Sequence, residues 1–132
     1  MQLTAACFYA VRALVFLAAL PGGRLLASHD IARPAGIPAG YGLKVLGPLA
    51  DAGLLRSRKG PGGGYRLARP AGEIALLEVV EAMDGPLRGQ APGVNGAAND
   101  QLKAVCQRAA ERARELLAKV SVADLARAGD CA

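Results

Sequence analysis

The sequence predicts a mainly α-helical chain that carries one two-stranded hairpin, and three observations lead to this prediction. Apolar side chains recur every three or four residues along residues 3–20 and again along residues 100–120, the spacing of one helix face. Between these segments, two short strand-like runs flank a glycine-rich tip at residues 60–64, which is typical of a hairpin. The chain has 132 residues, 52% of them hydrophobic, so one domain with an aliphatic core is the simplest organisation.

The first helix is expected over residues 3–20, because this run is long and apolar and Pro21 and two glycines end it. A membrane span is the alternative, but Arg12 near the centre of the run would cost about 2.5–3.5 kcal/mol in a bilayer. A signal peptide would carry basic side chains before its apolar run, and no basic side chain precedes this one. We therefore expect a buried helix and no membrane partner.

A second helix, a tight turn and a third helix are expected between residues 28 and 53. Ser28 is the expected N-cap of the second helix, and Gly36 supplies the turn. The third helix should begin near Pro38, because proline suits a first helical turn. Gly47 and Pro48 are unfavourable inside a helix and suggest a break there. Two helices joined in this way predict a helix-turn-helix.

Two strand-like arms follow at residues 54–58 and 65–69, and a hairpin directly after a helix-turn-helix makes a winged helix. Because side chains alternate along a strand, Leu55, Tyr65 and Leu67 should face the core. The side chains that should face solvent are Arg56, Arg58 and Arg66.

The last third of the chain predicts a fourth helix over residues 74–83, a flexible linker at residues 85–99 and a long helix. Asn99 or Asp100 could cap the long helix, and Ser121 could cap a short last helix. An unpaired apolar stripe of this length would favour aggregation, so that pairing with a second copy is the simpler interpretation. The stripe contains Leu102, Val105, Cys106, Ala109, Ala113, Leu116, Leu117 and Val120.

The excess of positive charge lies entirely in the first half of the chain. Residues 1–69 carry nine basic and two acidic side chains, whereas residues 70–132 carry seven basic and nine acidic ones. This asymmetry indicates a polyanion as the partner of the first half, the alternative being a solvated basic face without a partner.

The segment RSRKGPGGGYRLARP, residues 56–70, holds five of the sixteen basic residues and no acidic one. Glycine lets a backbone approach a phosphate closely, and Arg and Lys neutralise its charge. A nucleotide-binding loop is excluded, because neither GxxxxGK followed by Ser or Thr nor GxGxxG occurs, and a strand follows the glycines. A mobile hairpin tip with incidental charge is the remaining alternative.

The segment also resembles the wing of the iron–sulfur cluster regulator and cysteine-metabolism repressor family, which are bacterial winged-helix transcription factors. The resemblance extends through YAVRAL, DIARPAGIPAGY, LGPLADAGLLRS, EIALLEVVEAMDGP and VADLA, and so covers nearly the whole chain. It implies a homodimer that binds a palindromic operator in double-stranded DNA and represses transcription. A cytoplasmic location is expected because the three cysteines are too few and too scattered for a disulfide framework. The resemblance further implies a DNA-binding domain over residues 1–84, the linker at residues 85–99, and a dimerisation helix with a tail over residues 100–132.

By this resemblance the start of the third helix enters the major groove and the wing contacts the backbone. Lys44 could reach a guanine edge or a phosphate, Leu43 a thymine methyl group or the core, and Tyr41 a phosphate or a packing partner. Relatives often carry Ser, Glu and Gln here, so their operator sequence is not transferred. The expected DNA-binding residues are Ser28, Pro38, Ala39, Gly40, Tyr41, Leu43, Lys44, Arg56, Arg58, Lys59, Gly62, Gly63 and Arg66. The expected dimerisation residues are Leu102, Val105, Ala109, Ala113, Leu116, Leu117 and Val120.

Many relatives bind an iron–sulfur cluster through three cysteines, and these are missing here. Residues 84–105 contain no cysteine, and the position of the last ligand falls near Asp100, a poor substitute for a thiolate. Neither an iron–sulfur cluster nor another metal is expected, and the lone His29 is an exposed helix residue. Cys7 and Cys106 leave a thiol switch open, although packing is the simpler role for both.

An enzyme is not expected from this sequence. It offers no pair of nucleophile and base, no paired carboxylates and no metal-ligand spacing. The alternative to a DNA-binding regulator is an adaptor that keeps the winged helix but works through protein contacts. The effector or partner protein to which the chain responds cannot be deduced from the residues.

Overall fold

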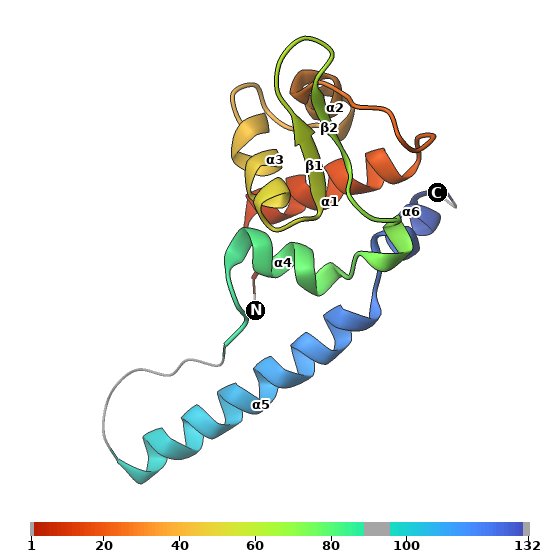
Figure 1. Ribbon diagram of the computed structural model, residues 1–132. Coiled ribbons are helices and arrows are strands. Elements are labelled where there is room, and N and C mark those ends of the chain that lie inside the picture. Colours follow the sequence, from red (N-terminus) through yellow and green to blue (C-terminus); the bar gives the residue numbers. More distant parts are fainter. Residues whose placement is uncertain (1, 89–95, 131–132) are drawn as a thin grey trace.

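The computed structural model of the chain describes residues 2–88 and 96–130, with side chains as far as residue 128. It is mainly helical with a two-stranded antiparallel hairpin, as the sequence predicts (Figure 1). The elements are α1 (Ala5–Ala18), α2 (Ser28–Ala35), α3 (Gly42–Asp51), β1 (Leu55–Arg58), β2 (Gly64–Leu67), the 3₁₀ turn η1 (Ala71–Glu73), α4 (Leu76–Asp84), α5 (Ala97–Lys119) and α6 (Val122–Asp130).

Helix α1 lies at the centre of the core. Its buried residues Ala10, Ala13 and Leu14 pack against α2, α3, the hairpin and α4, and the core is aliphatic. The helix is shorter at both ends than the expected 3–20. Thr4 caps it by accepting a hydrogen bond from the Cys7 amide at 3.2 Å, and the Thr4 hydroxyl and amide donate to the Asp84 carboxylate at the end of α4.

The helix-turn-helix is present, but three details differ from the sequence prediction. Ala27 occupies the N-cap position of α2, so Ser28 is the first helical residue and no cap. Helix α3 begins at Gly42 rather than near Pro38, because Pro38–Tyr41 forms a turn closed by a 3.0 Å bond from the Tyr41 amide to the Pro38 carbonyl. The expected break at Gly47 is wrong: α3 runs through Pro48, held by the buried side chains of Val45, Leu46 and Leu49.

The hairpin pairs β1 with β2 in a register that places Leu55 opposite Leu67 and Arg56 opposite Arg66. Leu26, in the loop after α1, extends this sheet: it exchanges two backbone hydrogen bonds with Tyr65, at 3.0 and 2.8 Å. The hairpin is thereby fastened to the body of the molecule by a third, one-residue strand.

The C-terminal elements also begin at residues other than those expected. Ile74 belongs to an extended segment before α4, where the Val122 amide donates to the Ile74 carbonyl. Helix α5 begins at Ala97 with Gly96 as its N-cap, and not with Asn99 or Asp100. Ser121 does cap α6, through reciprocal bonds of 3.1 and 2.9 Å with Asp124. Residues 89–95, the middle of the expected linker, lie outside the described residues.

Helix α5 lies along one end of the molecule, whereas the hairpin tip projects at the opposite end, beside α2 and α3 (Figure 1). Helix α6 returns to pack on α1 and η1. Within the described part of the chain, no helix combines the length and apolarity that crossing a bilayer requires.

Candidate nucleic-acid interface

Three arginines lie on one face of the hairpin. Cross-strand partners in an antiparallel pair share a face, so Arg56 and Arg66 lie side by side and Arg58, opposite Gly64, lies on the same face. These three side chains, with Gly23, Leu25 and Ser57, line a hollow of about 470 Å³. None of them forms an ion pair in the described part of the chain. Because like charges placed side by side repel each other, this face favours a bound anion.

The glycines of the tip have a geometric role within the hairpin itself. A Cβ atom on Gly63 would lie 2.1 Å from the Arg58 carbonyl oxygen, a distance that no side chain tolerates. Gly62 has φ +75°, in the left-handed region that favours glycine. The shape of the tip therefore requires both glycines, whether or not DNA is bound. Lys59 is exposed beside them.

The substitution Gly63→Ala should distort the tip, because the methyl group and the Arg58 carbonyl cannot share the same space. We expect the free energy of unfolding to fall by about 1–3 kcal/mol, as for other overpacked sites. Chemical denaturation measures this effect. Gly22→Ala is the matched control, since its Cβ meets nothing within 4 Å and its φ is ordinary. Equal stability of the two variants would contradict the geometry described for the tip.

The exposed side of α3 carries Leu43 and Lys44, since Val45, Leu46 and Leu49 face the core. Leu43 is 66% exposed, which removes the core alternative for this residue. Gly40 has φ +83°, so a conformational requirement accounts for glycine there.

Tyr41 packs against two neighbouring side chains, those of Tyr9 and Lys44. Its ring meets that of Tyr9 edge-on, with centroids 5.8 Å apart, and the Lys44 Nζ lies 5.7 Å from its centroid. Tyr41 thus holds the turn before α3 against α1 and orients Lys44. It is still 36% exposed and accessible to a ligand.

The remaining sequence-predicted residues of α2 and α3 lie around the start of each helix. Pro38 and Ala39 are exposed in the turn before α3, and Ser28 is half-buried at the start of α2. His29 is exposed and lies 3.4 Å from Asp30.

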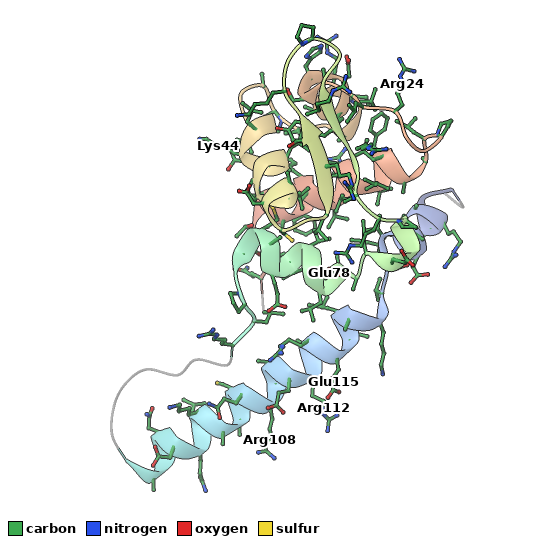
Figure 2. The ribbon with its side chains drawn as sticks, viewed as in Figure 1. Arg24, Lys44, Glu78, Arg108, Arg112 and Glu115 are labelled. Carbon is green, nitrogen blue, oxygen red and sulfur yellow. The ribbon has the colours of Figure 1, made fainter. Side chains whose placement is uncertain are left out.

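Sequence reasoning missed Arg24, whose side chain lies at the same end of the molecule as the hairpin, whereas Lys44 projects from α3 (Figure 2). A basic residue directly after a Pro-Gly-Gly loop was the available signal.

The apolar residues of α5, and Val120 directly after it, differ in exposure. Leu102, Val105 and Leu116 are 50%, 51% and 65% exposed, and Ala109 is exposed as well. Leu117 instead packs within its own chain, against Cys7 and Val80. The other two expected members are half-buried: Ala113 lies within α5, and Val120 follows the helix and accepts a hydrogen bond from the Leu76 amide through its carbonyl. The outward face, defined here by Leu102, Val105, Ala109 and Leu116, is the part open to a partner.

The two described cysteines differ in environment. Burial, reinforced by the negative charge of Asp84, raises the pKa of the Cys7 thiol to about 11. Cys106 is half-buried on α5. The thiolate is the reactive form of cysteine, so that Cys7 is a poor candidate for a thiol switch in the folded protein.

The third cysteine, Cys131, lies outside the described residues and is replaced in this test. In the Cys131→Ser background, we expect a disulfide reagent at neutral pH to modify Cys106 and to leave Cys7 unmodified until the chain unfolds. A pKa of about 11 leaves Cys7 with roughly 100-fold less thiolate than an ordinary cysteine. Mass spectrometry after timed exposure, with and without denaturant, measures both rates. Modification of Cys7 as fast as that of Cys106 would contradict this assignment.

The comparisons with known proteins agree with this arrangement. Two helix-turn-helix-type transcriptional regulators, each from a strain of Mycobacterium tuberculosis, are 41% identical over 87 residues, which is 66% of this chain. The chain spans about half the length, 54%, of these curated relatives.

Solved structures of three further proteins share the fold. CymR, the global cysteine regulator of Bacillus subtilis, has a TM-score of 0.78 at 22% identity, over 96% of this chain and 97% of its own. IscR of T. potens has a TM-score of 0.75 at 24% identity, over 98% and 88%. CymR of Staphylococcus aureus has a TM-score of 0.71 at 28% identity, over 93% and 96%. Residues 3–128 match the Rrf2 family, described as an iron-dependent transcriptional regulator. The chain therefore belongs to the Rrf2 family of winged-helix transcriptional regulators.

Proposed function

We propose that this protein is a cytoplasmic DNA-binding repressor that acts as a homodimer on a palindromic operator. The observation that carries the proposal is the cationic face of the hairpin, where Arg56, Arg58 and Arg66 surround one hollow without an acidic partner in the described residues. A dimer bound across a promoter would exclude the polymerase, which is the simplest way for a small DNA-binding protein to regulate transcription.

Each subunit would use two elements on the duplex. Helix α3 would enter the major groove, with Lys44 reaching a guanine edge or a phosphate and Leu43 contacting a thymine methyl group. The hairpin would lie along the backbone, where its arginines neutralise phosphates and Lys59 reaches toward the adjacent groove. The exposed side of α3 and the charged face of the hairpin support this arrangement.

The outward face of α5 supports the homodimer. Three large apolar side chains on this face are at least half exposed, and a second copy of the same face would remove them from water. A two-fold axis would then place two α3 helices about one helical turn of DNA apart, or a multiple of it, and would require a palindromic operator.

We further propose that the protein works without an iron–sulfur cluster, although the description of its family mentions iron. Such a cluster is held by several thiolates. Cys7 is buried among apolar side chains, and residues 84–105 hold no cysteine. The described residues bring together no group of three or more His, Cys, Asp or Glu side chains suited to a metal ion. Protein purified without oxygen should contain no stoichiometric iron and show no visible absorption, and the opposite result would overturn this part.

Selection of bound fragments from random duplex DNA, followed by binding at two salt concentrations, tests the function. A repressor of this kind should enrich a palindrome and lose affinity steeply as salt rises, because each neutralised phosphate releases counterions. An adaptor that works through protein contacts would form a dimer but enrich no sequence. A stable monomer that ignores every duplex at low salt would overturn the proposal as a whole.

A further inference from the structure

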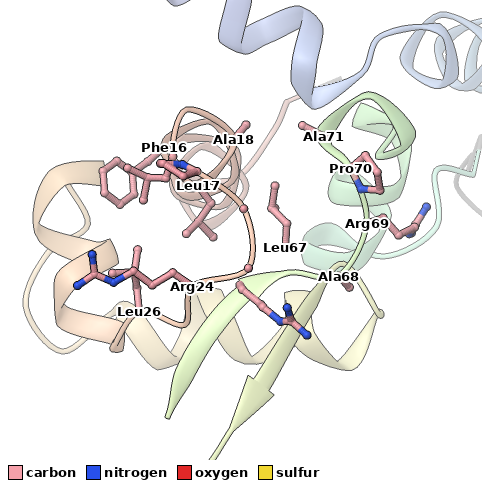
Figure 3. A pocket seen from close by; sticks show the side chains of 15 residues that line it. Phe16, Leu17, Ala18, Arg24, Leu26, Leu67, Ala68, Arg69, Pro70 and Ala71 are labelled. Carbon is pink, nitrogen blue, oxygen red and sulfur yellow. The ribbon is translucent and has the colours of Figure 1, made fainter. Parts of the chain in front are cut away.

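A cavity of about 720 Å³ lies between the C-terminal end of α1 and the chain that leaves β2, and the loop after α1 borders it (Figure 3). Phe16, Leu17 and Ala18 come from α1, and Leu67 projects between this helix and Ala71 (Figure 3). The volume is in the range of small-molecule sites, about 300–1,000 Å³. The cavity adjoins the core cluster around α1, since Phe16, Leu17 and Leu67 pack in that cluster and also line the cavity.

Among the described residues, the walls of the cavity are apolar apart from three arginines, and no acidic or other polar side chain lines it. Arg69 is already engaged: it donates to both carboxylate oxygens of Glu78, at 3.2 and 2.5 Å, and to the Glu73 carbonyl at 2.9 Å. This bonding holds the pKa of Glu78 below its ordinary value, so that the pair stays ionised. Arg24 and Arg66 form no ion pair in the described part of the chain.

An apolar wall beside two uncompensated guanidinium groups selects for one class of small molecule. The apolar body of the ligand would cover Phe16, Leu17 and Leu67, and a carboxylate at its end would form charge-assisted hydrogen bonds with the arginines. A nucleotide fits less well, because its phosphate and its base would compete for the same arginines, and the described residues of the walls offer no side-chain hydrogen-bond acceptor to a base. The chemistry therefore favours a small monocarboxylate with an aliphatic or aryl body.

Arg66 connects this cavity with the cationic face of the hairpin. Arg66 is among the residues that line both the 720 Å³ cavity and the hollow that Arg56 and Arg58 share. A single guanidinium group cannot serve a carboxylate in the cavity and a DNA phosphate at full strength. Occupation of the cavity should therefore weaken the contact that Arg66 makes on the other side.

We propose that this cavity binds a small amphipathic carboxylate through Arg24 and Arg66, and that the bound carboxylate lowers the affinity of the protein for DNA by engaging Arg66. The second half of this inference rests on the proposed function, and the first half does not.

Calorimetric titration of the DNA-free protein tests the binding half. The probes are 4-phenylbutyrate and octanoate, and 4-phenylbutanamide is the neutral analogue of the first. We expect both carboxylates to bind, with 4-phenylbutyrate at least about tenfold tighter than its amide, because hydrogen bonds between two charged groups are stronger than those to a neutral amide. Arg24→Gln should remove most of this preference and leave the affinity for the amide unchanged. Lys103→Gln on α5, with the same change of charge, should alter neither affinity.

The binding half is overturned if neither carboxylate binds at millimolar concentration, if the amide binds equally well, or if Arg24→Gln leaves the preference intact.

Titration of a selected duplex over a series of salt concentrations, with and without saturating 4-phenylbutyrate, tests the regulatory half. We expect a lower affinity and a salt dependence reduced by about 1.8 in slope, since one phosphate contact per subunit would be lost at about 0.9 each. An unchanged affinity and slope with the probe bound would overturn this half. A protein that binds duplex DNA but no carboxylate would refute the cavity and support the function. Selective carboxylate binding by a protein that ignores DNA would support the site and refute the function.

Discussion

The double substitution Arg56→Gln/Arg58→Gln should lower the affinity for a selected duplex by at least about 100-fold. Both side chains are exposed on the cationic face of the hairpin and have no acidic partner in the described residues, so that their removal costs the free protein little. In a dimer the double substitution removes four cations from the DNA. Hydrogen bonds to charged groups contribute about 1.5–3 kcal/mol each, and solvent screening at this surface reduces that contribution.

Fluorescence anisotropy over a salt series is the measurement for this prediction. In a plot of the logarithm of affinity against the logarithm of salt concentration, the line should become less steep. If each arginine neutralises one phosphate, the magnitude of its slope should decrease by about 3 to 4. Arg88→Gln/Lys103→Gln is the matched control, because both side chains are exposed outside the hairpin and the change of charge is the same. An equal loss in the control would mean that overall charge, and not this face, binds DNA.

The double substitution Leu102→Asp/Leu116→Asp should convert the proposed homodimer to a monomer that remains folded. The two side chains are 50% and 65% exposed, so the isolated chain loses little packing when they are replaced. In the dimer, four leucines would be lost from the interface. Full burial of each contributes about 1.5–3 kcal/mol, and buried aspartates would add a desolvation cost. The dissociation constant of the dimer should therefore rise by at least about 1,000-fold.

Sedimentation equilibrium measures the dissociation, and circular dichroism shows whether the helices persist. The salt slope of DNA binding should fall to about half, because a monomer contacts one half-site. Ala104→Asp/Gln107→Asp is the control: both positions are exposed on α5 and point away from the outward face by helical spacing. A double-leucine variant that stays dimeric would show that another surface joins the subunits.

Local patterns predicted the element types well because they depend on neighbouring residues. The apolar periodicity of residues 3–20 predicted α1, and the glycine tip between alternating arms predicted the hairpin, with Arg56 and Arg66 on its outer face. Element ends were predicted less well. Ser28 and Asp100 are good N-cap residues, yet Ala27 and Gly96 hold the N-cap positions. For α2, the backbone pairing of the neighbouring Leu26 with Tyr65 positions the chain just before the helix, and the local sequence does not record this pairing.

The sequence by itself determined the winged helix, its family and the positive charge of its hairpin, because these follow from periodicity, composition and a contiguous motif. Only the tertiary structure decided that Leu117 faces inward, that Leu26 completes the sheet, and that Arg24 and Arg66 line one cavity. Each of these depends on contacts between residues far apart in the chain. Neither spacing nor composition records such contacts, because they follow from how the elements pack on one another.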